Sequence, residues 1–311
     1  MIYKYRFSIF TATYNRSSML EKLAEMISKQ TFNGKYEWII VNDGSTDNTV
    51  DVVNSIIVSS KIPIKFINNK ENRGKHTAWR SATKVFDGQY VVTCDDDDPI
   101  ALNMLAVFDK YWTQLEESTE YSSFWEVRAR CQYENGMLVG EELPKPYFDS
   151  DYNEVTFRLK KGCEMVGCRK VEVLRNEASV PDKFLFEEKC SNFPEGVRWT
   201  NAARKYKTRF VPDVTRTYVV GHDSLCTTPS GGGKSCKKKY NSLVSALYSL
   251  NKQGDLLEKY NFRLYSMTIL QLAYSAIRVR KNILSRVERI SDRILVALAY
   301  IPGIFIYLIR R

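Results

Sequence analysis

Short apolar runs alternate with amphipathic segments along the first third of the chain. The apolar runs predict strands at residues 7–13, 36–41, 64–67 and 89–94. The segments between them predict helices, of which the first has Ser18 and Glu21 at capping-box spacing and the second an apolar face through Val50, Val53 and Ile57. Strands and helices in strict alternation predict a parallel sheet with right-handed crossovers.

Polar residues follow three of these predicted strands. Tyr14 comes after the first strand, Asp43 ends the second, and four consecutive aspartates, Asp95–Asp98, follow the fourth before Pro99 stops it. In open parallel sheets, ligands bind outside the carboxyl ends of the strands. We therefore expect these side chains to form one site.

The four aspartates need a compensating charge, because adjacent carboxylates repel one another. Mg²⁺ and Mn²⁺ prefer oxygen ligands, so the run predicts a divalent metal site. An EF-hand loop is excluded, since Ile100 and Ala106 stand where that loop needs glycine and glutamate. A solvated acidic turn is the alternative interpretation.

Four segments together resemble the motifs of family 2 glycosyltransferases. They are Thr-Ala-Thr-Tyr-Asn-Arg at 11–16, Val-Asn-Asp-Gly-Ser-Thr-Asp at 41–47, Glu-Asn-Arg-Gly-Lys-His-Thr-Ala at 71–78 and the aspartates at 95–98. The resemblance implies an α/β GT-A fold, a Mn²⁺ or Mg²⁺ ion, and transfer of a sugar from a nucleotide-diphosphate sugar with inversion. Two departures from the family pattern are Ala12, where many members have proline, and Trp79-Arg80, which replaces a frequent Arg-Asn pair.

The resemblance also implies roles for individual residues. Asp95-x-Asp97 is similar to the DxD motif, with Asp97 as metal ligand, and Glu195 best matches the catalytic base. Glu187 and Glu188 are alternatives, and a plain helix N-terminal residue is another interpretation of Glu195. His222 is a further candidate for phosphate or metal. The nucleotide-sugar is expected to contact Ala12, Tyr14, Asp43, Arg73, Lys75, Asp95 and Asp96.

Composition adds a basic character to this picture. The 311 residues carry a formal net charge of +10, which suggests an anionic partner such as a nucleotide or a lipid surface. Seven scattered cysteines without CxxC pairs argue against a disulfide framework or a zinc ribbon and suit a reducing cytosol. We expect no secretory signal and no nucleic-acid partner.

The rest of the chain is less regular. It predicts a helix at 102–115, a strand at 124–131 followed by an Asn135-Gly136 hairpin turn, and a strand at 166–173. The stretch 230–235 is glycine-rich, but Thr228 stands where a P-loop needs glycine, so we expect a flexible basic loop.

Residues from 243 onward have helical periodicity, and a basic stretch precedes the apolar run 294–309. That run is shorter than the ~20 residues of a spanning helix, and Pro302-Gly303 is expected to interrupt it. We expect it to lie on an anionic membrane surface. A terminal helix packed on the domain or on a dimer partner is the alternative.

These observations predict a GT-A domain at 1–225 and a basic helical extension at 226–311. Residues 1–115 would bind the nucleotide-sugar and 116–225 the acceptor. We expect a UDP-sugar donor, a glycan or lipid-linked glycan acceptor of cell-surface polysaccharide synthesis, and a cytoplasmic location at the inner face of the membrane. One alternative is a sugar-1-phosphate nucleotidyltransferase, although residues 11–16 lack its usual glycine-rich loop. The other is a non-catalytic, membrane-associated nucleotide-binding protein.

Overall fold

The computed structural model describes residues 3–141, 143, 145–151, 153–155, 164–190, 193–219 and 236–309. The chain divides into two compact units. Unit 1 comprises Met1–Tyr152, Lys161–Ser179 and Ala202–Thr228, and unit 2 comprises Asn153–Lys160, Val180–Asn201 and Pro229–Arg311. The division at residues 225 and 226 stays a prediction.

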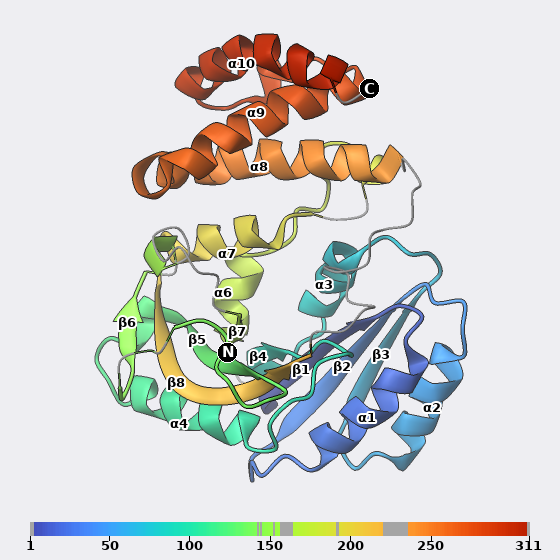
Figure 1. The fold of residues 1–311 in the computed structure, drawn as a ribbon. Coiled ribbons are helices and arrows are strands. Elements are labelled where there is room, and N and C mark those ends of the chain that lie inside the picture. The colour runs from blue at the N-terminus through green and yellow to red at the C-terminus, as the bar shows by residue number, and fades with distance from the viewer. Residues whose placement is uncertain are drawn as a thin grey trace. The chain divides into compact units, whose positions relative to one another are not determined.

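Unit 1 is built on an eight-stranded sheet with the strand order β3-β2-β1-β4-β7-β5-β8-β6 (Figure 1). Its first half is parallel, as the sequence predicted, and consists of β1 (Tyr5–Thr13), β2 (Tyr36–Asp43), β3 (Ile64–Asn69) and β4 (Gly88–Thr93). The crossover helices are α1 (Ser17–Ser28), α2 (Thr49–Ser59) and α3 (Lys75–Thr83). The fold is thus α/β, and the carboxyl ends of β1, β2 and β4 lie at one edge.

The second half of the sheet is mixed. Strand β7 (Met165–Lys170) runs antiparallel to β4 and β5, whereas β5 (Phe124–Tyr133) and β8 (Lys207–Tyr218) are parallel, and β6 (Phe148–Ser150) is antiparallel to β8. The predicted helix at 102–115 is α4 (Met104–Glu116). The turn after β5 is also confirmed, because Gly136 has φ +80° and the Tyr133 N–H bonds to the Met137 carbonyl at 2.8 Å.

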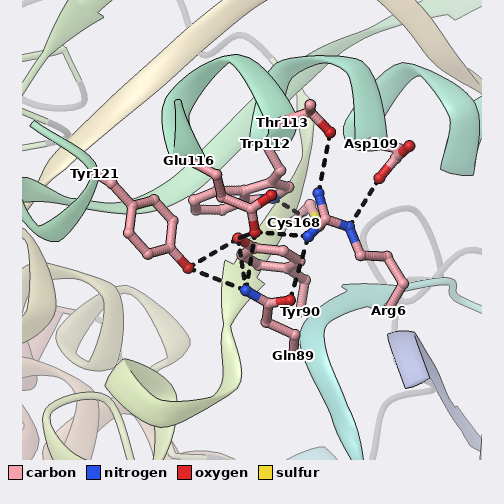
Figure 2. A network of polar contacts seen from close by, with 9 residues as sticks. All are labelled: Arg6, Gln89, Tyr90, Asp109, Trp112, Thr113, Glu116, Tyr121 and Cys168. Atoms are coloured by element: carbon pink, nitrogen blue, oxygen red, sulfur yellow. Dashed lines mark hydrogen bonds and ion pairs between the residues drawn. The ribbon is translucent and has the colours of Figure 1, made fainter. Parts of the chain in front are cut away.

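A partly buried polar network joins α4 to the starts of β1 and β4 (Figure 2). The Tyr90 hydroxyl donates to Glu116 at 2.7 Å and lies 2.9 Å from the Tyr121 hydroxyl, while its ring stacks on Trp112. Arg6 donates to Glu116 at 2.6 Å and to Asp109 at 2.8 Å. The network lies at the amino ends of the strands, so it holds the sheet from the edge opposite to the predicted site.

Several local predictions were wrong in detail. Helix α1 begins at Ser17 with Arg16 as its N-cap residue, so Ser18 lies inside the helix and no side-chain cap forms, while Ser17 bonds to Asn48 and Asp47 of the loop after β2. Helix α2 buries Ile56 in place of Ile57. The strand expected at 166–173 ends at Lys170, where the short helix α6 (Val171–Asn176) starts directly.

Unit 2 is helical in its described part. Helix α7 (Glu195–Ala203) starts in it, and α8 (Cys236–Tyr260), α9 (Phe262–Val279) and α10 (Ile290–Ile309) form a stack with α9 in the middle (Figure 1). The core between them is aliphatic and aromatic, with members such as Leu250, Leu272, Ala276 and Val296. The C-terminal helical region predicted from residue 243 onward is therefore present.

The expected interruption at Pro302-Gly303 was wrong, because α10 is one helix of 20 residues with Pro302 inside it. Pro302 is exposed, and Gly303 packs so closely on α9 that an added Cβ would lie 3.1 Å from the Ile277 Cδ1 atom. This tertiary contact stabilises the helix across the proline. Within the described residues, α10 is also the helix that is long and apolar enough to cross a membrane, judged by length and composition.

Candidate active site

The acidic turn, Asp95–Asp98, leaves the carboxyl end of β4 and is fastened on both sides. The Cys94 N–H bonds to the Phe10 carbonyl of β1 at 2.9 Å. After the turn, the Thr217 N–H bonds to the Pro99 carbonyl at 2.8 Å, and Ile100 forms a bridge with Arg216 of β8. The turn is therefore held between β1 and β8, and this pairing brings Arg216 beside it.

The four carboxylates alternate in exposure. The side chains of Asp95 and Asp97 are 32% and 34% exposed, whereas those of Asp96 and Asp98 are only 4% and 12% exposed. The exposed pair has the spacing of the predicted Asp95-x-Asp97 motif. A ligand at this edge would thus meet Asp95 and Asp97 before the other two.

Three cationic side chains compensate the acidic turn. Arg16 lies 3.0 Å from Asp96 and 2.6 Å from Asp97, and Lys75 lies 2.8 Å from Asp95. Arg216 bridges Asp98 at 2.7 Å and Glu164 at 2.6 Å. These side chains supply the compensating charge that the repulsion argument requires, while the divalent metal stays a prediction.

Burial and these ion pairs set the pKa values of the turn in opposite directions. Burial raises the pKa of Asp98 to about 6, because lost hydration and the neighbouring carboxylates outweigh Arg216. Burial also raises the pKa of Asp96, against the opposing effects of Thr13 and Arg16. For Asp95 burial acts in the same sense, but Lys75 reverses it and lowers the pKa below its ordinary value. Asp95 is consequently ionised at neutral pH.

Asp43 ends β2 and organises the loop that carries Lys75. Its carboxylate accepts the Arg73 N–H at 3.1 Å and the Gly74 N–H at 2.7 Å, and Gly74 caps α3 immediately before Lys75. Gly44 permits this contact, since it has φ +76° and an added Cβ would lie 2.4 Å from the Glu71 carbonyl carbon. Asp43, Arg73, Lys75 and Asp95 are thus brought to one edge.

The loop after β1 positions Arg16. Asn15 has φ +52°, its side chain accepts the Thr46 N–H at 2.8 Å, and its own N–H bonds to the Ser45 hydroxyl at 2.9 Å. The loop after β2 therefore fixes the turn from which Arg16 reaches the aspartates. Tyr14 stands in the same turn and is 43% exposed, and Ala12 is half-buried in β1.

Two residues of this edge were missed by the sequence predictions. Arg16 closes the Thr-Ala-Thr-Tyr-Asn-Arg segment, so its position in that motif was an available signal. Arg216 lies 118 residues beyond Asp98 in the sequence, and no local pattern pairs the two. Its placement depends on the register of β8 against β5.

The predicted acceptor-side residues belong to unit 2. Glu195 is the first residue of α7 and is half-buried, and Glu187 and Glu188 lie in a short 3₁₀ turn, half-buried and exposed respectively. The helix N-terminus predicted for Glu195 is confirmed, while its role as base stays a prediction. His222 lies outside the described residues.

The acidic turn fits a divalent ion in its donor chemistry. Carboxylate oxygens are hard ligands, and the exposed Asp95 and Asp97 are the two that a metal would reach. Within the described residues, no group of three or more His, Cys, Asp or Glu side chains is arranged to hold a metal. The turn would therefore supply one or two ligands, and phosphate and water the others, as is common for Mg²⁺.

A family comparison agrees with this geometry. Residues 8–125 match the model described as glycosyl transferase family 2. The match covers 118 of the 311 residues, and this part of the chain is similar to that family. The matched segment contains β1 to β4, the acidic turn and Arg16, Asp43 and Lys75.

Solved structures support the same fold over nearly the whole chain. TarS of Staphylococcus aureus in complex with UDP gives a TM-score of 0.59 at 16% identity, covering 96% of this chain and 88% of TarS. The mannosyltransferase PcManGT of Pyrobaculum calidifontis in complex with GDP-Man and Mn²⁺ gives a TM-score of 0.50 at 16% identity, covering 97% of this chain and 81% of PcManGT. At this identity the likeness shows the fold, which is GT-A.

A relative by sequence is the GalNAc(5)-diNAcBac-PP-undecaprenol beta-1,3-glucosyltransferase of Campylobacter jejuni. It is 28% identical over 238 residues, which are 76% of this chain and 71% of the relative. Two other relatives match over shorter segments. The uncharacterized glycosyltransferase YwdF of Bacillus subtilis is 39% identical over 93 residues, and the glycosyltransferase GlyG of Streptococcus pneumoniae is 29% identical over 110 residues. In these two cases the chain spans about a third of the relative's length, 33% and 35%.

Proposed function

We propose that this protein is an inverting glycosyltransferase that transfers a sugar from a nucleotide-diphosphate sugar to a lipid-linked glycan. The observation that carries the proposal is the acidic turn. It lies at the carboxyl edge of the sheet, inside the family-matched segment, with two half-exposed carboxylates among three cations. Such an arrangement suits a diphosphate, which needs both cationic groups and a metal-binding carboxylate.

The donor side of the reaction is assigned to unit 1. Lys75 and Arg16, now on the aspartates, would contact the diphosphate oxygens, and the Asp43 loop would hold the base or ribose near Tyr14. A Mn²⁺ or Mg²⁺ ion on Asp97, with help from Asp95, would stabilise the charge of the leaving diphosphate. A UDP-sugar is our first candidate donor, since TarS is known in complexes with UDP and UDP-GlcNAc.

The acceptor side is assigned to unit 2. Glu195 would accept the proton of the acceptor hydroxyl as that oxygen attacks the anomeric carbon. As the first residue of α7 its carboxylate is stabilised by the helix dipole, and its backbone is fixed by the helix that follows. A lipid-linked glycan is our candidate acceptor, because the Campylobacter jejuni relative is named for an undecaprenol-linked one.

A donor screen tests the assignment of unit 1. UDP- and GDP-sugars are compared for thermal stabilisation of the protein with and without Mn²⁺, because a ligand that binds the folded state raises its apparent stability. Asp97→Asn is expected to abolish the metal-dependent part of the nucleotide affinity measured by calorimetry. Asp51→Asn, an exposed acid on α2, is the matched control and should behave as the wild type. Unchanged metal-dependent affinity in Asp97→Asn would refute the metal assignment.

A second experiment tests the base. Glu195→Gln keeps the size of the side chain but cannot accept a proton, so kcat should fall about 10²–10⁴-fold while donor affinity stays near that of the wild type. The exposed Glu188→Gln is the control. If Glu187→Gln or Glu188→Gln abolishes transfer and Glu195→Gln does not, the base lies in the preceding segment.

A further inference from the structure

Helix α10 has an apolar surface that its own unit leaves uncovered. One stripe of the helix, Asp292, Val296, Ala299 and Gly303, is buried on α9. The rest of its circumference carries large exposed apolar side chains: Ile290, Ile294, Leu295, Leu298, Ile301, Ile304, Phe305, Leu308 and Ile309. Ile301 and Phe305 are 75% and 69% exposed. An apolar surface of this extent is typical of a contact with a membrane or another protein.

The positive charge of the protein gathers in the same region. Residues 262–311 contain nine arginine or lysine residues and two acidic ones, which amounts to seven of the chain's ten net positive charges. Arg280 and Lys281, at the end of α9, are both exposed, and within the described residues neither side chain has a carboxylate partner. The charge next to the apolar face is thus available for an anionic ligand.

A pocket connects the two features. It has a volume of about 370 Å³ and lies between the end of α9 and the middle of α10, lined by Ala276, Ile277, Leu284, Ala297 and Tyr300 together with Arg280, Lys281 and Asn282. Its lining is apolar, with the two cationic residues among it. An acyl chain and an anionic headgroup are the pair of chemical groups that match such a lining.

We infer that α10 and the end of α9 form a docking surface for an anionic lipid bilayer, in which α10 lies in the plane of the membrane. The exposed apolar side chains of α10 would enter the acyl boundary, and Arg280 and Lys281 would bind lipid phosphates beside the pocket. This inference does not depend on glycosyl transfer, because it concerns surfaces in unit 2 alone.

The packing of α10 favours an in-plane position over a spanning one. Asp292 is fully buried, accepts a hydrogen bond from the Tyr265 hydroxyl at 2.6 Å, and lies 3.6 Å from the Arg289 guanidinium. A spanning α10 would have to leave α9 and give up the hydrogen bond from Tyr265 and the close contact at Gly303. Helix α9 cannot cross with it, since exposed Arg263 and Gln271 interrupt its surface.

Flotation of the full chain with vesicles tests the surface. The wild type should float with phosphatidylcholine vesicles that contain phosphatidylglycerol and less with phosphatidylcholine alone. Ile301→Asp combined with Phe305→Asp should reduce binding to background. The matched control is Val58→Asp on α2, where an equally apolar side chain is 88% exposed, and it should bind as the wild type. Circular dichroism checks that each variant is folded.

A second pair of variants tests the headgroup contact. Arg280→Gln with Lys281→Gln should weaken binding to the anionic vesicles about 30-fold, since each cation near the surface contributes about a factor of five. Lys61→Gln with Lys70→Gln, two exposed lysines of unit 1, is the control and should have no effect. Equal losses in both pairs would mean that only net charge matters and would overturn the assigned headgroup site.

Two further outcomes would overturn the inference. A protease site added after residue 311 should be cut by protease outside sealed vesicles, and protection of that site would indicate a spanning α10. If the wild type is a dimer in solution that Ile301→Asp with Phe305→Asp makes monomeric, and neither floats, the face is an interface between two copies.

Discussion

Replacing Arg216 with methionine is expected to destabilise unit 1 by about 3–5 kcal/mol, the usual cost of removing one partner of a buried ion pair. The guanidinium lies 2.7 Å from Asp98 and 2.6 Å from Glu164. The Arg216 and Asp98 side chains are only 8% and 12% exposed, so water cannot take the place of the guanidinium at Asp98. Glu164 is half exposed and should contribute little to the loss.

Urea denaturation followed by tryptophan fluorescence is the assay for Arg216→Met. Four of the five tryptophans, Trp38, Trp79, Trp112 and Trp125, are buried in unit 1, so the signal follows that unit. Lys207→Met is the control in the same strand, because its pair with Glu120 is exposed and 3.5 Å long. That variant should lose less than about 1 kcal/mol.

A double variant separates the buried charge from the lost packing. Arg216→Met combined with Asp98→Asn should recover much of the stability, since no uncompensated carboxylate remains. The reasoning is refuted if Arg216→Met lowers the free energy of unfolding no more than Lys207→Met does. It is also refuted if the losses caused by Arg216→Met and Asp98→Asn alone simply add up in the double variant.

Three further predictions concern unit 1. Tyr90→Phe removes a hydroxyl bonded to Glu116 and should cost about 1–3 kcal/mol in urea denaturation. Burial lowers the pKa of Lys170 to about 8, so its charge destabilises the folded state below pH 8, and stability should rise by up to about 3 kcal/mol between pH 8 and 10.5. Lys170→Met should remove that rise. If the stability of the variant still increases between pH 8 and 10.5, another titrating group is responsible. Gly44→Ala should collapse the Asp43 loop and weaken nucleotide binding in calorimetry, whereas Gly136→Ala, at a similar φ with open space around it, should change only stability, by about 1 kcal/mol.

The parallel half of the sheet was predictable because its signals are local. Each strand there is a continuous apolar run, and each loop brings its polar residues to the strand's carboxyl end, so the parallel direction of the strands and the edge that carries the polar residues follow from the alternation. Tyr14, Asp43 and Asp95 were placed correctly at one edge for this reason. Among the details that failed, the predicted cap Ser18 lies inside α1, because the helix starts at Ser17 with Arg16 as its N-cap residue.

The long-range features were not predictable. Arg216 reaches Asp98 through the register of β8 with its neighbours and through its bridge to Ile100, which no sequence period encodes. The continuity of α10 through Pro302 likewise depends on the contact of Gly303 with α9. Helix propensity alone predicted a break there, because it contains no term for tertiary packing.

The acidic turn divides its cations into two kinds, and the division follows from burial. Arg216 is 8% exposed and is paired with the buried Asp98, so its role is to stabilise the fold. Arg16 and Lys75 are 26% and 35% exposed and lie on the very carboxylates that a metal would need. A bound diphosphate would offer these two cations new oxygen partners, and Asp95 and Asp97 would then be free to hold a divalent ion, which would supply the compensating charge. Donor binding would then exchange one set of ion pairs for another without leaving a charge uncompensated, which explains how four adjacent aspartates remain both stable and available.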